Sequence, residues 1–154
     1  MLHSFHLLSG ADHPPSEYLK WPRETDGVRL HDDLMAYMWD ALSWAPCFYP
    51  QAGMREANKL DRCGPAVFRG RGALKLAEVM EGYGNIFSCG PDVLHLNCGV
   101  LLPAADEPQT FESAQINLQS FGRDETVSKL RLVAGWARQA SAADATEYVA
   151  FRGL

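Results

Sequence analysis

Alternating apolar and polar residues predict the clearest strand of the chain at Val93–Leu102. One face of this strand carries apolar side chains at every second position: Leu94, Leu96, Cys98, Val100 and Leu102. A second alternating run, Thr110–Leu118, follows an acidic turn, so the two runs predict a hairpin. Polar residues on the other face indicate an antiparallel sheet that is open on one side. We expect the leucine face to be buried on a central strand, with the last helix packed across it.

Apolar residues at a spacing of three and four predict three helices. Their expected ranges are His31–Ala45, Ala73–Phe87 and Asp124–Ala142. Asp32 or Asp33 is expected to cap the first helix, because a carboxylate accepts hydrogen bonds from free amides and favours the positive end of the dipole. Gly82 and Gly84 weaken the second helix by about 1 kcal/mol each and point to close contact with another backbone.

Shorter apolar runs predict strands at Phe5–Ser9, Pro65–Gly70 and Thr146–Phe151. Proline and glycine mark Gly10–Gly27 as a loop, and Cys47–Gly64 as a loop containing one helical turn at Met54–Lys59. The expected order is β-α-β-α-β-β-α-β. It predicts an α+β fold, a mainly antiparallel sheet of about four to five strands with about three helices packed on one face. A length of 154 residues predicts a single globular domain over residues 1–154.

Composition and charge exclude several classes of protein. Hydrophobic residues make up 47% of the chain and charged residues 21%, which is typical of a globular domain. With 14 Lys+Arg and 19 Asp+Glu the net charge is −5, so direct nucleic-acid binding is not expected. Apolar runs stay far below the ~20 residues that cross a bilayer, so no membrane association is expected. The N-terminus has no basic signal region, so we expect a cytoplasmic protein.

The four cysteines, Cys47, Cys63, Cys89 and Cys98, contain no C-x-x-C pair. Zinc ribbons and thioredoxin-like sites need close pairs, so free thiols, no bound zinc and no cofactor are expected. His3 and His6 form an H-x-x-H motif with His13 nearby. In a strand His3 and His6 point to opposite faces, so this motif does not predict a metal site.

Two further segments resemble sites of chemistry. Cys89 lies on a turn with His95 six positions later, and Asp92 could orient the histidine, so a small Cys/His-dependent hydrolase or transferase is an alternative function. The segment Gly70–Ala73 opens a helix as phosphate-binding loops do. It lacks the third glycine of a dinucleotide motif and the Lys-Ser/Thr of a P-loop, so a strand-to-helix turn is the better interpretation.

From Leu60 the chain reads LDRCGPAVFRGRGALKLAEVMEGYGNIFSCGPDVLHLNCG, and it ends with EYVAFRGL. This skeleton resembles small bacterial immunity proteins of contact-dependent or type VI-delivered polymorphic toxins. The resemblance covers residues 60–154 and rests on glycines and apolar positions. It implies a binding protein that occludes the active site of a cognate toxin effector, without a catalytic residue of its own.

The N-terminal third has the composition of a protein interface. Residues 1–40 hold three basic and seven acidic side chains, a net charge of −4, and aromatics lie among them. Carboxylates would steer a basic toxin and aromatics would anchor it. The expected partner-binding residues are Asp12, Glu17, Tyr18, Trp21, Glu24, Asp26, Asp32, Asp33, Tyr37 and Asp40. Trp44 is expected in the core. The oligomeric state is left open, and a homo-oligomer is compatible with the sequence.

Overall fold

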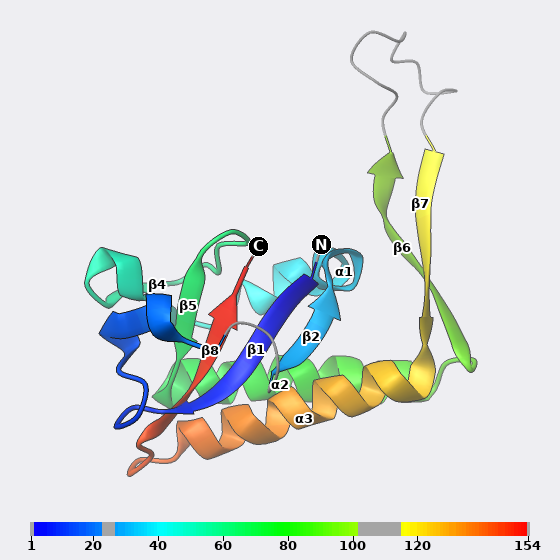
Figure 1. Cartoon of the computed structure of the whole chain (residues 1–154). Helices are drawn as coiled ribbons and strands as arrows, with labels where there is room; N and C mark the ends of the chain where they lie inside the picture. The colour runs from blue at the N-terminus through cyan, green and yellow to red at the C-terminus, as the bar shows by residue number, and fades with distance from the viewer. Residues whose placement is uncertain (1, 23–26, 102–114, 154) are drawn as a thin grey trace, which may run out of the picture.

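The computed structural model describes residues 2–22, 27–101 and 115–153 (Figure 1). Its main sheet has six strands in the order β2-β1-β8-β5-β3-β4, and every pairing in it is antiparallel. These strands are β1 Leu2–Ser9, β2 Val28–His31, β3 Cys47–Tyr49, β4 Arg55–Ala57, β5 Pro65–Phe68 and β8 Glu147–Arg152. The α+β class and the mainly antiparallel sheet are confirmed, and the strand count exceeds the expected four to five.

The first and last strands pair in the middle of the sheet, which brings the two ends of the chain close together (Figure 1). Side chains on β8 alternate between the two faces. Val149 and Phe151 belong to the larger hydrophobic core, and Tyr148 and Ala150 belong to a smaller cluster. The last strand is therefore buried on both faces.

Three helices pack on one face of the sheet: α1 Asp32–Leu42, α2 Gly70–Ser88 and α3 Arg123–Ser141. The long helices α2 and α3 lie side by side and antiparallel (Figure 1). The close contact with another backbone expected at Gly82 and Gly84 is not found: a Cβ atom on Gly84 would meet side-chain atoms of α3 at ordinary van der Waals distance, 3.6 Å from the Cγ atom of Arg131, and one on Gly82 would meet no described atom within 4 Å.

The opposite face is covered by two short 3₁₀ helices, η1 Pro15–Lys20 and η2 Pro50–Ala52, and the chain around them. Trp21 follows η1 and packs against Tyr148 with 5.8 Å between ring centroids. The sheet therefore has apolar layers on both sides, although the covering on this side is thin.

The expected central hairpin proves to be a separate two-stranded ribbon of β6 Val93–Leu101 and β7 Gln115–Gly122. It extends from the ends of α2 and α3 beside α1 (Figure 1). Leu94 and Leu96 are buried as expected and Cys98 is half-buried, but their strand is not central and it contacts α1 more than α3. Alternating apolar and polar residues predict that one face of a strand is buried, but they do not predict which element covers that face. Leu102 and residues 110–114 lie outside the described residues.

Other local predictions were wrong where short strands carry little periodicity. Gly10–Gly27, expected as a loop, contains the 3₁₀ helix η1, the unpredicted strand β2 begins at Val28, and the loop expected after Cys47 contains β3 and β4. The helical turn expected at Met54–Lys59 is instead replaced by β4, because Gly53 and Met54 adopt positive φ and reverse the chain. His31, rather than Asp32 or Asp33, caps α1: its Nδ1 atom accepts from the Asp33 amide at 3.2 Å.

Within the described ranges, the protein has no helix that is both long and apolar enough to cross a bilayer.

Candidate partner-binding surface

The structure places the expected interface residues on two faces of the sheet. One group lies on and around η1: Asp12, Glu17, Tyr18 and Trp21. The other lies on α1, against the helical face: Asp32, Asp33, Tyr37 and Asp40. Glu24 and Asp26 lie outside the described residues. Sequence proximity therefore did not bring the eight described residues into one surface, because β2 lies between the η1 segment on one face of the sheet and α1 on the other.

Trp21 is only 2% exposed and belongs to the core. The backbone carbonyl of Trp21 accepts a hydrogen bond from Arg152 at 3.2 Å, which ties the segment to the last strand. Tyr18 packs edge-on against the same indole and is half-buried. An interface anchor must be accessible before binding, so Trp21 is a structural anchor of the η1 segment and is not an exposed contact.

The α1 group divides further. Asp32 Oδ1 lies 2.7 Å from both His3 Nε2 and Arg62 Nη2. Burial opposes ionisation of this carboxyl, but the hydrogen bonds and charges of His3 and Arg62 outweigh it and lower the pKa of Asp32. Asp33 Oδ2 lies 3.3 Å from His31 Nδ1, but that nitrogen accepts from the Asp33 amide in the helix cap and so does not donate to the carboxylate. Asp32 is therefore held by two partners within the protein, and Asp33 lies beside the cap of its own helix.

Tyr37 and Asp40 lie close to a groove between α1 and α2 with a volume of about 340 Å³. Its most exposed apolar members are Trp44, at 68%, and Ile86, at 64%. We call this surface the α1–α2 groove and define it by Ala41, Trp44, Lys75, Glu78, Val79, Gly82, Tyr83 and Ile86. Exposed aromatic and aliphatic side chains around a depression are typical of protein-binding surfaces.

The exposure of Trp44 corrects the expectation that it is a core residue. Helix α1 ends at Leu42, and the chain then turns through backbone bonds from Trp44 to Ala41 and from Ala45 to Leu42. This turn buries Ala45 completely and leaves the indole of Trp44 outside. Helical spacing continued beyond Leu42 predicts that Ala45 is buried, but it does not predict which way the Trp44 side chain points.

An aromatic cluster supports one end of the groove. The rings of Tyr37, Tyr83 and Phe87 contact one another with centroids 5.8–6.2 Å apart. Burial, with the nearby Tyr37 and Asp40, raises the pKa of Tyr83. Tyr37 is 42% exposed, and it extends the apolar surface from α2 onto α1.

Gly82 lies on the exposed surface of the groove. A Cβ atom at this position would meet no described atom within 4 Å, so none of the described contacts requires a glycine there. Lys75 and Glu78 pair across 2.5 Å at the rim. Asp40 is exposed at the other side. The groove thus combines an apolar centre with a charged rim, the usual anatomy of an interface.

The catalytic alternative finds different partners for its three residues. The Cys89 thiol donates to the Asn85 carbonyl at 3.5 Å. Asp92 pairs with Arg123 at 3.0 Å. His95 Nδ1 lies 2.9 Å from Ser120 Oγ, across the ribbon. The structure does not join Cys89, Asp92 and His95 in a hydrogen-bonded set.

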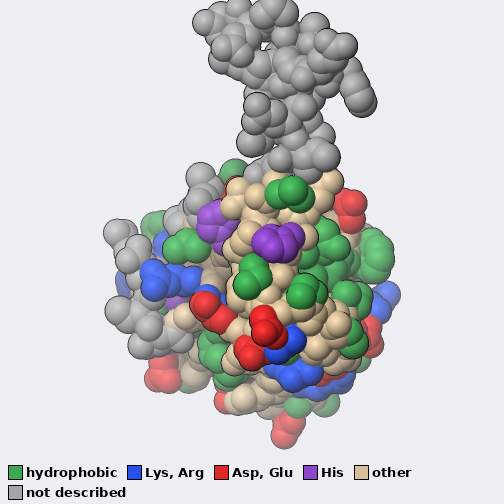
Figure 2. Space-filling view, turned by 90° about the vertical axis from the view of Figure 1, so that its right-hand side faces the viewer, with side chains coloured by type: hydrophobic (Ala, Val, Ile, Leu, Met, Phe, Trp, Pro, Cys, Tyr) green, Lys and Arg blue, Asp and Glu red, His purple; other side chains and the backbone are tan. Residues whose placement is uncertain are grey.

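The face at the ribbon end mixes hydrophobic, acidic and basic side chains (Figure 2). Two ion pairs belong to this end of the molecule, Arg123 with Asp92 and Lys129 with Glu125. Neither sign of charge dominates the described part of this face. The mixture of charges on this face therefore does not itself indicate a charged partner, although the net charge of the chain is negative.

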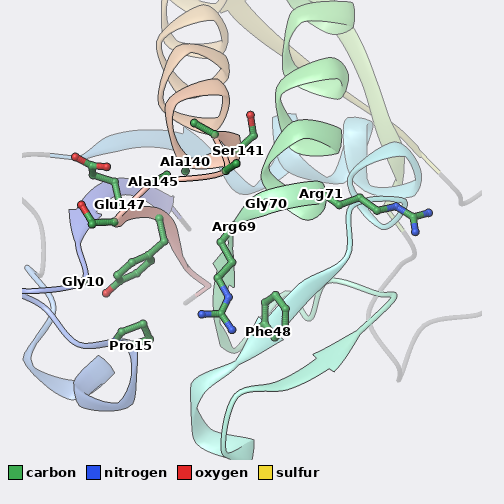
Figure 3. Close-up of a pocket in the computed structure, with 14 residues that line it drawn as sticks. Gly10, Pro15, Phe48, Arg69, Gly70, Arg71, Ala140, Ser141, Ala145 and Glu147 are labelled. Atoms are coloured by element: carbon green, nitrogen blue, oxygen red, sulfur yellow. The ribbon is translucent and has the colours of Figure 1, made fainter.

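The glycine-rich segment at the start of α2 has a structural explanation. Gly70 has a φ of +51°, and a Cβ atom on Gly72 would lie 1.9 Å from the Pro46 carbonyl oxygen. The segment borders a cavity of about 500 Å³, where Arg69 lies over the Phe48 ring at 4.5 Å and Arg71 points away (Figure 3). Left-handed backbone and close chain approach are sufficient reasons for these glycines, as expected for a strand-to-helix turn.

The described residues contain no group of three or more histidine, cysteine, aspartate or glutamate side chains placed to hold a metal ion. Comparisons with protein-family models, with curated proteins and with solved structures found no match. The functional argument therefore rests on the geometry of this chain.

Proposed function

We propose that this protein is a cognate immunity protein, which binds and neutralises a bacterial toxin effector in the cytoplasm by occluding the toxin's active site. The α1–α2 groove is its contact surface. The observation that carries this proposal is the exposure of Trp44 and Ile86 on a groove that Gly82 also lines. Large apolar side chains that project around a depression gain free energy when a partner covers them.

The charge of the chain supports a basic partner. A net charge of −5 favours encounter with a cationic protein, and Asp40 places one carboxylate beside the groove. Trp and Tyr are enriched among the residues that dominate binding energy. Trp44, Tyr37 and Tyr83 supply these types at one place, whereas Trp21 is buried and cannot.

The experiment is co-purification of the protein with the product of its neighbouring gene, followed by measurement of the dissociation constant. Trp44→Asp and Ile86→Asp should each weaken binding by about 30-fold or more, which corresponds to the hot-spot threshold of about 2 kcal/mol. Both side chains are exposed, so the midpoint of thermal unfolding should change little.

Leu118→Asp is the matched control. Leu118 is 62% exposed and lies on the ribbon strand β7, outside the groove. It should leave binding unchanged. If Trp44→Asp and Ile86→Asp bind as well as the unaltered protein, the groove is not the contact surface. If the product of the neighbouring gene is not a toxin, and this protein inhibits no toxin, the immunity function is refuted.

A further inference from the structure

A second cavity, of about 530 Å³, lies on another flank of α1, where the chain passes from β4 to β5. We call it the Arg62 cavity. Its walls include Trp39, Tyr49, Lys59, Leu60 and Arg62. Its volume is within the range of about 300–1,000 Å³ that is usual for small-molecule sites. It shares no lining residue with the α1–α2 groove.

The guanidinium of Arg62 is held in a fixed position. Its central carbon lies 5.5 Å from the centroid of the Trp39 ring, and its Nη2 atom donates to Asp32 at 2.7 Å. The same carboxylate oxygen lies 2.7 Å from His3 Nε2. His3 is 1% exposed and stacks on Phe151, with 5.6 Å between centroids. Arg62 is therefore positioned by a chain of contacts that begins in the core.

The backbone beneath the cavity is held as well. A Cβ atom on Gly153 would lie 1.7 Å from the Arg62 carbonyl oxygen, so the C-terminal segment packs directly against this loop. The Tyr49 hydroxyl donates to the Lys59 carbonyl. Leu60 is 1% exposed and fixes the loop in the core. Because these contacts already hold the lining residues in place, ligand binding costs little conformational entropy of the protein.

The chemistry of the wall combines aromatic surface with cations. Trp39 and Tyr49 are half-buried and offer ring surface. Arg62 is 44% exposed, and its planar fork carries donors beyond the one that Asp32 uses. Lys59 is exposed and forms no ion pair with any described residue. Asp61 is the one acidic residue among the described residues that line the cavity, and its Oδ1 atom accepts from the Cys63 amide at 3.0 Å.

We infer that the Arg62 cavity binds a small planar aromatic anion. The ring packs against Trp39 and Tyr49, and the anionic group lies between Arg62 and Lys59. This site is separate from the proposed toxin contact, so either assignment can fail without the other. The anionic group can be a phosphate, as in a nucleotide, or a carboxylate on an aromatic acid. Both present oxygens that a guanidinium binds through paired donors.

Calorimetric titration tests this inference with AMP for the phosphate source and 4-hydroxybenzoate for the carboxylate source. At least one should bind saturably below about 1 mM, an affinity that corresponds to about 4 kcal/mol. Adenosine and inorganic phosphate should each bind at least about tenfold more weakly than AMP if AMP is the ligand type, because each lacks one half of the recognition. Failure of both AMP and 4-hydroxybenzoate to bind would overturn the inference.

Arg62→Lys keeps the charge and removes the fork, so it should weaken binding by about tenfold. Lys59→Gln should also weaken it, and Lys59 is exposed, so folding is not at risk. Arg55→Lys is the matched control, since Arg55 is exposed on β4 and outside the cavity lining. Unchanged affinity in both Arg62→Lys and Lys59→Gln would place the ligand elsewhere and refute this site.

Discussion

His3 on the first strand and Asp32 at the start of α1 are 29 positions apart, and their Nε2 and Oδ1 atoms lie 2.7 Å apart. The histidine is buried, and the carboxylate also accepts from Arg62. This contact links the central part of the sheet to the helix that carries the α1–α2 groove. Asp32, which was expected to contact a partner protein, therefore stabilises the fold through His3 and Arg62.

The first prediction follows from the lowered pKa of Asp32. A carboxyl with a depressed pKa stabilises the folded state above its unfolded value, near 3.8, and loses this contribution as the pH falls through the folded-state pKa. Asp32→Asn should lower the free energy of unfolding at pH 7 by about 1.5–3 kcal/mol, the range for hydrogen bonds to charged groups.

Urea unfolding from about pH 7 to about pH 2 measures this effect. The difference between Asp32→Asn and the unaltered protein should shrink as the pH falls below 3.8. Asp124→Asn is the control, because Asp124 is 87% exposed and its one ion pair among the described residues is with the neighbouring Arg123. A difference that stays constant over this pH range would show that the charge of Asp32 does not contribute.

The second prediction concerns Trp21, which the sequence suggested as an interface anchor. Its indole fills the thin apolar layer between η1 and Tyr148. Trp21→Ala should therefore cost about 3–5 kcal/mol of unfolding free energy, as large-to-small core changes do. Chemical denaturation measures this cost. A loss below about 1 kcal/mol would mean that the η1 segment is not anchored to the sheet by this residue.

How far the sequence predicts the fold depends on the length of the pattern. The helices α2 and α3 lie within three residues of their expected ends, because long amphipathic repeats record one buried face. Strands β2, β3 and β4 have three or four residues each, too few to show a period. The pairing of β1 with β8 joins segments more than 130 positions apart, and no local pattern encodes it.

The candidate site was predicted only in part. Tyr37 and Asp40 were expected on an interface and do border the groove. The α2 residues Gly82, Tyr83 and Ile86 were missed, because in the sequence they belong to an amphipathic helix like any other. One signal was present: Ile86 falls off the apolar stripe of α2. Trp44 was missed because the end of a helix, rather than its period, decides where it points.

The third prediction concerns thiol reactivity. Cys63 and Cys89 are exposed, Cys98 is half-buried, and Cys47 is fully buried with its pKa raised to about 11 by desolvation. In the native protein a thiol reagent should react rapidly with Cys63 and Cys89, more slowly with Cys98, and with Cys47 only after unfolding. Denatured, unreduced protein should titrate four thiols. A total of two or none would indicate disulfides and contradict the free thiols of this structure.

The fourth prediction tests the contact between the C-terminal segment and the Arg62 loop. A Cβ atom on Gly153 would lie 1.7 Å from the Arg62 carbonyl oxygen and 3.1 Å from the Cys63 amide nitrogen. Gly153→Ala must displace one of the two chains and should cost about 1–3 kcal/mol, as overpacking does. Gly122→Ala is the control, since its Cβ meets nothing within 4 Å. Equal stability of the two variants would show that the C-terminal segment does not pack there.

The fifth prediction separates stability from binding at Gly82. Both Gly82 and Gly135 are exposed glycines inside long helices, and a Cβ at either position meets no atom within 4 Å. Replacing either with alanine should raise the free energy of unfolding by about 0.5–1 kcal/mol, because alanine loses less backbone entropy in a helix. Thermal or urea unfolding measures both gains.

Binding to the partner should then distinguish these two glycines. Gly135 lies on α3, outside the groove, so Gly135→Ala should bind as the unaltered protein does. Gly82 lines the groove, and a larger residue such as leucine would occupy space there that a partner side chain would otherwise take. Gly82→Leu should keep the fold and weaken binding, whereas Gly135→Leu should keep the fold and leave binding unchanged. If Gly82→Leu folds and binds with unchanged affinity, the partner does not pack against the surface of α2 at Gly82.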